Sequence, residues 1–410
     1  MRPSSTSLMI VLPAKTVCLS ASGHQRRLVA RAASLPVIAW LYGGGFYTGG
    51  ANVPYQNPIQ WVERSQKHIV VSINYRLNIF GFPNGAGLAS TEQNLGFLDQ
   101  RLGLEWIRSN IANFGGDPKR ITLWGQSAGA MSADFYNFAY PEDPIVHGYI
   151  LHSGTAQIAL SVDANNHSNF TYVASHLGCA NLTAAAELSC LRRVPEKEII
   201  SFIENQSNTG VVPSLAFSYV PDNRIIFPNY TTRALSGRFS KKPALIGTTT
   251  NEGAAFAAYD RTSGPDPAEA TFYTLSTFLC PTVQTTRDRY AAGAPTFRYL
   301  YGGNFSNISP QWWEGAYHSS DLPLVFGTSG IARGESTSFE KEVQDQMQDY
   351  WVAFAEDPVG GLKRVGWEEY EPEGGGVLFA WEGVVRQGIG VGKLEGACEG
   401  LVPKEGARPP

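Results

Sequence analysis

One serine of the chain lies in a pattern that can present a nucleophile. Ser127 is the centre of Gly125-Gln126-Ser127-Ala128-Gly129, a G-x-S-x-G pattern that lifts a serine side chain out of the end of a strand at the start of a helix. The pattern alone is weak evidence. A β-type run, Ile121–Trp124, precedes it, however, and small, helix-compatible residues follow it. This context predicts a catalytic nucleophile and not an ordinary serine in a glycine-rich turn.

A serine hydroxyl is a poor nucleophile at neutral pH, so Ser127 needs a base and a group that orients the base. On this type of turn the chain order is serine, then an acid, then histidine. Of the seven histidines, only His318 leaves room for an acid after a further predicted strand, and we predict that it is the base. The seven are His24, His68, His147, His152, His167, His176 and His318.

The acid is less constrained, because many carboxylates lie between the serine and the histidine. Glu252 is the best placed, since it follows the apolar run Ala244–Thr248 and so lies at a strand end, where an acid can reach an imidazole. Asp222, Asp260 and Asp288 are the alternatives. Their polar surroundings favour solvated loop residues or helix caps.

A reaction at a carbonyl also needs N–H donors for the oxyanion of the tetrahedral intermediate. One donor comes from the residue after the nucleophile, Ala128. The run Tyr42-Gly43-Gly44-Gly45-Phe46 follows the first strong predicted strand, and glycines let backbone N–H groups approach a substrate. A phosphate-binding loop is the alternative, but the Lys-Ser/Thr of such a loop does not follow.

Short apolar runs of strand length must position these residues. Between two of them, Asn94–Ile111 carries apolar residues at helical spacing. Strands that alternate with amphipathic helices predict a mostly parallel sheet covered on both faces. Residues 155–235 interrupt the alternation, and we expect a helical insertion there. The predicted strands are Val37–Tyr42, Ile69–Asn74, Ile121–Gly125, Gly148–Ser153, Ala244–Thr248, Phe297–Tyr301 and Val377–Trp381.

Composition restricts the partners. The 410 residues are 43% hydrophobic and carry a net charge of -4 without a basic run, so no footprint for nucleic acid or an anionic membrane is visible. No run reaches the roughly 18 apolar residues of a membrane span. We therefore expect a small-molecule substrate. The catalytic groups described above need no metal and no organic cofactor.

Two features, the cysteine set and a dense group of glycosylation sequons, point to the secretory route, whereas the start of the chain is harder to interpret. Arg2 followed by Leu8–Leu12 has the order of a signal peptide, but the apolar run is too short to be convincing. Five cysteines are present, an odd number that leaves at least one thiol without a partner. Seven Asn-x-Ser/Thr glycosylation sequons occur, at Asn166, Asn169, Asn181, Asn205, Asn229, Asn304 and Asn307.

With these motifs the chain resembles the type-B carboxylesterase/lipase family, the cholinesterase-like α/β hydrolases, and is most similar to its fungal members. The run through GGDP to GQSAG is highly specific. The matching stretches are Leu35–Gly50, Val70–Phe82, Asn94–Met131, Tyr149–Gly154, Ile246–Gly253 and Gly315–Gly327.

The resemblance implies an α/β-hydrolase fold and a site. It implies a triad of Ser127, Glu252 and His318 and no metal. It also implies an oxyanion hole formed by the N–H groups of Gly44, Gly45 and Ala128. Two further implications are a Ser153 hydroxyl near the triad and a disulfide between Cys179 and Cys190. Ser153 as a simple strand-end cap remains an alternative.

The N-terminal region departs from the family pattern. Family members have a longer segment before the glycine-rich loop, including the first strands and, in lipases, a lid. We therefore expect an N-terminally truncated chain with an irregular leader at 1–34, a carboxylesterase domain at 35–390 that lacks N-terminal edge strands, and a tail at 391–410.

The expected activity is hydrolysis of carboxylic esters through an acyl-enzyme. An esterase is favoured over a lipase because no lid segment is visible. The alternatives are a catalytically inactive, cholinesterase-like binding protein and a truncated inactive product. Four large aromatic residues are candidates for a substrate pocket, although such residues more often belong to a core: Phe46, Trp124, Trp312 and Trp313.

Overall fold

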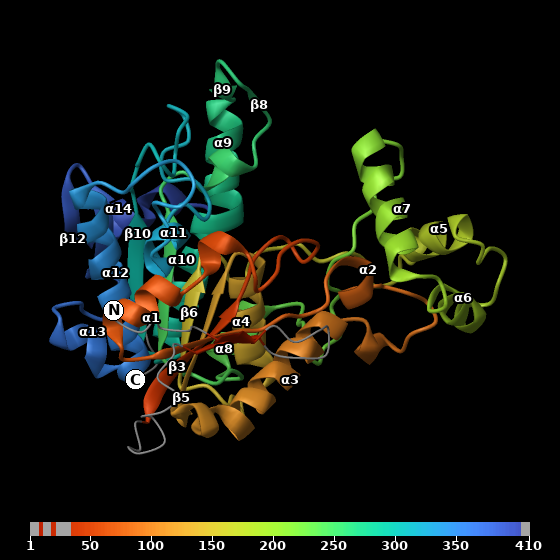
Figure 1. Ribbon diagram of the computed structural model, residues 1–410, viewed down its shortest axis with the longest axis horizontal. Coiled ribbons are helices and arrows are strands. Elements are labelled where there is room, and N and C mark those ends of the chain that lie inside the picture. Colours follow the sequence, from red (N-terminus) through yellow and green to blue (C-terminus); the bar gives the residue numbers. More distant parts are fainter. Residues whose placement is uncertain (1–7, 11–17, 22–33, 403–410) are drawn as a thin grey trace, which may run out of the picture.

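A ten-stranded mixed sheet forms the centre of the computed structural model (Figure 1). The structure describes residues 8–10, 18–21 and 34–402. In spatial order the strands are β1 (Leu8–Ile10), β2 (Cys18–Ala21), β4 (Ile69–Ser72), β3 (Leu35–Leu41), β5 (Gly116–Gln126), β6 (Gly148–His152), β7 (Ala244–Thr249), β10 (Thr296–Tyr301), β11 (Gly375–Trp381) and β12 (Val384–Gly390). A separate two-stranded sheet pairs β8 (Tyr259–Asp260) with β9 (Gly264–Pro265).

Every neighbouring pair from β4 to β11 is parallel. Every residue of β4, β6 and β7 is buried, as expected for parallel strands covered on both faces. The antiparallel pairs lie only at the two edges, where β2 pairs with β4 and β12 with β11. The prediction of a mostly parallel central sheet is confirmed.

Helices cover both faces of the sheet. α12 packs against β3 and β5 on one face, and α3 and α4 lie on the other (Figure 1). α12 begins at a capping box, in which Thr337 and Glu340 each accept the other's backbone N–H. The helices are α1 (Ile59–Ser65), α2 (Asn78–Gly81), α3 (Leu95–Asn110), α4 (Ala128–Ala139), α5 (Ser168–His176), α6 (Ala184–Leu191), α7 (Glu196–Thr209), α8 (Tyr230–Leu235), α9 (Pro267–Tyr273), α10 (Cys280–Ala291), α11 (Leu322–Phe326), α12 (Ser338–Glu356), α13 (Gly360–Arg364) and α14 (Val391–Glu395).

The sheet edges differ from the sequence-based expectation. We expected no N-terminal edge strands, whereas β1 pairs with β2 and β2 pairs with β4. Strands of three and four residues are too short to show a hydrophobic period, which is why the sequence did not indicate them. At the opposite edge, β12 was also missed, because its glycines are typical of loops.

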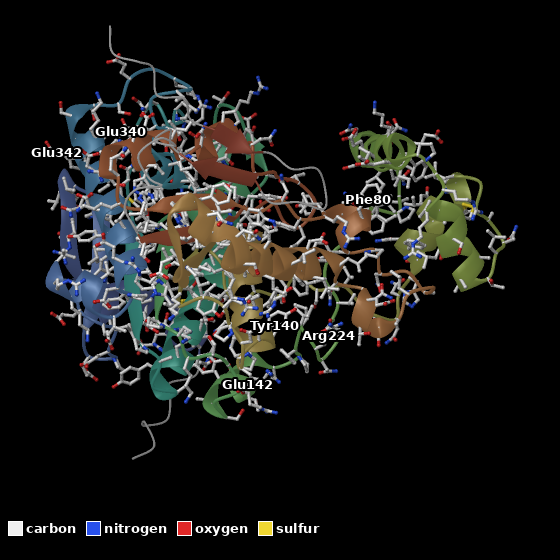
Figure 2. All side chains as sticks on the ribbon, turned by 60° about the horizontal axis from the view of Figure 1, so that its bottom comes forward. Phe80, Tyr140, Glu142, Arg224, Glu340 and Glu342 are labelled. Atoms are coloured by element: carbon white, nitrogen blue, oxygen red, sulfur yellow. A yellow bond between two sulfur atoms is a disulfide. The ribbon has the colours of Figure 1, made fainter. Side chains whose placement is uncertain are left out.

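The helical insertion has a small core of its own. Its helices α5, α6 and α7 project from one side of the sheet (Figure 1), and they share a buried cluster that includes Phe170, Val173 and Ile203. Phe80 of α2 packs against this cluster from the body of the protein (Figure 2). The prediction of a helical insertion is confirmed.

Two disulfides join four of the five cysteines. Cys179 is bonded to Cys190 inside the insertion, as the family resemblance implied. The second disulfide was not predicted: it joins Cys280, at the start of α10, to Cys398, which lies after α14. A separation of 118 residues gives no local signal in the sequence.

One buried histidine lies at the amino end of the sheet. His68 precedes β4, is 2% exposed and packs its ring against Trp61. Its Nδ1 lies 2.8 Å from Ser65 Oγ. Burial, with a smaller contribution from the charge of Arg64, lowers the pKa of His68 from 6.5 to about 3.

This lowered pKa predicts a pH dependence of stability. Between about pH 6.5 and 3 the unfolded chain binds a proton at His68 that the folded protein does not, so the free energy of unfolding falls as the pH falls, by up to about 1.4 kcal/mol per pH unit. In His68→Gln this contribution is absent. The free energy of unfolding, measured with urea, should fall from pH 7 to pH 4.5 in both proteins. The fall in the wild type should exceed the fall in the variant by about 2–3 kcal/mol. Equal losses would contradict the prediction.

Candidate active site

Ser127 lies between the end of β5 and the start of α4, on a strained turn. Its φ of 56° and ψ of -125° are rare for a residue with a side chain. Its N–H donates to the carbonyl of His152 at 2.9 Å, and its carbonyl accepts the N–H of Met131 at 2.9 Å. The end of β6 and the first turn of α4 thus hold the serine in this conformation.

Glycines allow the backbone to close around the serine. A Cβ at Gly129 would lie 2.7 Å from the carbonyl carbon of Leu41, so a side chain there would force α4 away from β3. A Cβ at Gly43 would lie 2.9 Å from Ser127 Cβ and 2.6 Å from Gln126 Oε1. The glycine-rich loop after β3 therefore runs directly beside Ser127.

This loop and the start of α4 offer N–H groups for an oxyanion. Gly44 and Gly45 are half-buried, with φ of 111° and 63°, and Ala128 is the first residue of α4, whose N–H has no partner within its helix. No hydrogen bond from any of these three N–H groups to another described residue is found. They are available to a negatively charged oxygen near Ser127.

The structure brings His318 and Glu252 together. His318 Nδ1 lies 2.5 Å from Glu252 Oε2, and the two residues are 8% and 0% exposed. A carboxylate at Nδ1 fixes the ring tautomer with Nδ1 protonated and leaves the Nε2 lone pair to act as a base. The second oxygen, Glu252 Oε1, accepts from Ser153 Oγ at 2.6 Å and from the N–H of Thr249 at 2.7 Å. Ser153 is thus in contact with the acid.

The three alternative acids are engaged elsewhere. Asp222 accepts N–H groups of its own loop and the side-chain amide of Asn94. Asp260 accepts N–H groups of the turn that follows it. Asp288 binds the side chains of Thr231 and Gln284. Of the four candidates, Glu252 is the one bonded to His318.

Aromatic rings surround the imidazole. The ring of His318 lies 4.5 Å from that of Phe278 and 5.1 Å from that of Phe256. Of the aromatic residues considered from the sequence, Phe46 and Trp124 are fully buried in the core and Trp312 is 76% exposed. Phe256 and Phe278 were missed because nothing in their local sequence ties them to His318.

Gln126 is a second site residue that sequence reasoning missed. Its Nε2 lies 3.0 Å from His318 Nε2 and 2.7 Å from Ser319 Oγ. Because Nδ1 faces the carboxylate, the amide N–H of Gln126 donates to the Nε2 lone pair of His318. The Ser127 hydroxyl, for which no hydrogen-bond partner among the described residues is found, must displace this amide to use the same lone pair. The only sequence signal was the position of Gln126 next to the serine.

Within 8–10, 18–21 and 34–402, no group of three or more His, Cys, Asp or Glu side chains that could hold a metal ion is found. In the same part of the chain, every helix is too short or too polar to cross a bilayer.

Comparison with known proteins identifies relatives over most of the chain. The profile of the carboxylesterase family matches residues 10–271 and 266–383. Secreted lipase 5 of Gibberella zeae is 46% identical over 386 residues, which cover 89% of this chain and 72% of the relative. A chlorogenic acid esterase of Aspergillus niger is 43% identical over 380 residues, 89% of this chain and 73% of the relative. An acetylcholinesterase of Bungarus fasciatus is 29% identical over 371 residues, which cover 78% of this chain and 61% of the relative. The fungal and cholinesterase-like resemblances of the sequence are confirmed.

The contact between Gln126 and His318 predicts the effect of a charge at this position. In Gln126→Glu, a carboxylate beside Nε2 favours the protonated ring, whose Nε2 has no lone pair to act as a base. The pH at which labelling by a fluorophosphonate probe is half-maximal should therefore rise by about one unit or more. Gln126→Met, which adds no charge, is the control and should shift this pH much less. Superimposable pH profiles for the wild type and Gln126→Glu would count against the contact.

Proposed function

The chain belongs to the carboxylesterase family, and from this premise we propose that it hydrolyses carboxylic esters through an acyl-enzyme formed on Ser127. The observation that carries the proposal is the buried 2.5 Å hydrogen bond between His318 Nδ1 and Glu252 Oε2, next to a serine on a strained turn. A pair of this kind supplies the base that a serine hydroxyl needs.

The proposed reaction has two halves. Ser127 Oγ attacks the ester carbonyl while His318 Nε2 takes the hydroxyl proton, and Glu252 stabilises the imidazolium that forms. The N–H groups of Gly44, Gly45 and Ala128 donate to the oxyanion. The C–O bond to the alcohol then breaks, and the alcohol leaves with the proton from His318.

Water completes the cycle. His318 takes a proton from the water molecule as it attacks the acyl group on Ser127. The bond between the acyl carbon and Oγ then breaks as His318 returns the proton to Oγ, which releases the acid and restores the serine hydroxyl. Each half returns the imidazole to its neutral form. The proposed chemistry uses side chains and backbone groups alone, without a metal or organic cofactor.

The substrate is proposed to be a small-molecule carboxylic ester. Of the relatives, one is called a lipase and one a chlorogenic acid esterase. The alternative of an inactive, cholinesterase-like binding protein is not favoured, because such proteins typically lose triad residues, whereas Ser127, Glu252 and His318 are all present.

Replacement of the nucleophile tests this proposal. In Ser127→Ala, hydrolysis of a short-chain nitrophenyl ester should fall by about 10⁴-fold or more, and labelling by a fluorophosphonate probe should disappear. Ser236→Ala, which changes an exposed serine at the end of α8, is the control and should behave as the wild type. Undiminished labelling of Ser127→Ala would refute the assignment of the nucleophile.

We also propose that the protein is secreted and glycosylated. Two disulfides are typical of oxidising compartments, and one relative is called a secreted lipase. The sequons differ in accessibility, however. Asn304 is exposed, whereas Asn307 is 8% exposed and its Nδ2 donates to the carbonyl of Ser329 at 3.1 Å and to Glu340 Oε1 at 3.0 Å (Glu340 is labelled in Figure 2).

These two sequons form a matched pair for an experiment. A glycan on Asn307 Nδ2 would replace one of the two amide hydrogens that form these bonds and would not fit at a buried position. Folded protein from a eukaryotic secretory host should therefore carry a glycan at Asn304 and none at Asn307. Peptide mass spectrometry measures the occupancy at each site. Asn304→Gln should reduce the glycan mass, and Asn307→Gln should leave it unchanged. Occupancy of Asn307 in the folded protein would contradict the prediction.

A further inference from the structure

A second histidine–carboxylate pair lies near the proposed triad. His152 Nε2 lies 2.5 Å from Asp321 Oδ2, and both residues are 0% exposed. The ring of His152 is surrounded by those of Trp124, Tyr299 and Trp351, at centroid distances of 5.8–6.2 Å. A substrate therefore has no access to this pair, and neither residue can transfer a proton to it directly.

His152 is connected to all three proposed catalytic residues. It is the last residue of β6, and its carbonyl accepts the N–H of Ser127. The next residue, Ser153, donates to Glu252. The side chain of His152 bonds to Asp321, which follows His318 by three residues in the same loop.

The loop that carries His318 is held at both ends. Before His318, the carbonyl of Ala316 accepts the N–H of Asn251, and Tyr317 forms a β-bridge with Asn251. After it, Asp321 bonds to His152 and its carbonyl accepts two N–H groups of α11. Between these ends, Ser319 has a φ of 76°, a conformation that persists only where the surroundings impose it.

We propose that His152 and Asp321 are a positioning pair that holds the His318 loop against the end of β6, so that the imidazole meets Ser127 and Glu252 in a reactive geometry. This inference rests on the proposed function. Displacing a reacting group by about 1 Å can cost about 100-fold in rate, and the bond to His152 is the link from the far end of the loop to the strand that holds Ser127.

The energetics of the pair favour a role in geometry over one in stability. His152 Nδ1 and Asp321 Oδ1 are both buried and have no hydrogen-bond partner among the described residues. Burying such atoms costs free energy that one hydrogen bond does not fully offset. Apolar side chains of similar volume can fill such a site with equal or greater stability. Replacing both partners with apolar residues is therefore expected to lower the rate more than the stability, whereas replacing one partner leaves the polar group of the other buried without its hydrogen bond.

A comparison of two replacements tests the role of the bond. In His152→Gln, the Nε2 amide group can take the place of the ring Nε2 and donate to Asp321, whereas His152→Leu fills the space without a donor. Both keep the backbone bond to Ser127. We expect kcat on the nitrophenyl ester and the rate of probe labelling to fall about 100-fold in His152→Leu and to stay within about fivefold of the wild type in His152→Gln. KM should change less than about threefold in both, because the pair does not contact the substrate.

A second pair of variants starts from the other partner. Asp321→Asn keeps an oxygen that accepts the His152 N–H and should retain activity. In Asp321→Leu, kcat should fall by about the same factor as in His152→Leu. The double variant His152→Leu/Asp321→Leu should be no slower than either single variant, since both remove one bond. His68→Leu changes another buried histidine, before β4 at the opposite end of the strands, and its kcat should equal that of the wild type.

Wild-type kcat in folded His152→Leu, or equal losses in His152→Leu and His152→Gln, would overturn the positioning role. If His152→Leu does not fold, the comparison of Asp321→Asn with Asp321→Leu tests the positioning role instead. Equal activities of these two variants would overturn that role as well. Failure of the proposed function gives a different result, because probe labelling of the wild type would then not depend on Ser127.

Discussion

The parallel arrangement of β5, β6 and β7 is the constraint on which the site depends. Because neighbouring parallel strands end at the same edge of a sheet, the residues that follow them come together although they are far apart in the chain. Ser127 follows β5, Ser153 follows β6 and Glu252 follows β7. The sheet alone therefore places these three residues at the same edge, whatever contacts their side chains make.

Close backbone approach shapes the proposed site at this edge. Gly129 lets α4 start against the end of β3, and Gly43 lets the glycine-rich loop pass beside Ser127. These close approaches bring N–H groups of the loop and of α4 beside the serine, which its hydrogen bonds with His152 and Met131 hold in a strained conformation. Packing, backbone strain and electrostatics are thus parts of one arrangement, in which a side chain at either glycine would disturb all three.

Buried polar contacts connect the catalytic elements to one another. Glu252 accepts from His318, Ser153 and Thr249, and His152 links the end of β6 to Asp321. Dissolved salt weakens such contacts only slightly, because the residues lie inside the protein. They join β6, β7 and the loop before α11, so that the loop histidine is bonded to residues at the strand ends.

The sequence by itself determined the features that are local. The strand-like run before Ser127, the glycines around it and the alternation of strands with helices predicted the turn and the mostly parallel sheet, because each depends on neighbouring residues. The order of the chain also favoured His318, and the position of Glu252 after a strand favoured it as the acid. The tertiary structure decided which side chains meet. Gln126 against His318, Phe256 and Phe278 around the ring, His152 against Asp321 and the Cys280–Cys398 disulfide join residues that are distant in the chain. Such contacts leave no periodic or local pattern, since they are set by the order of the strands and the packing of the helices on them.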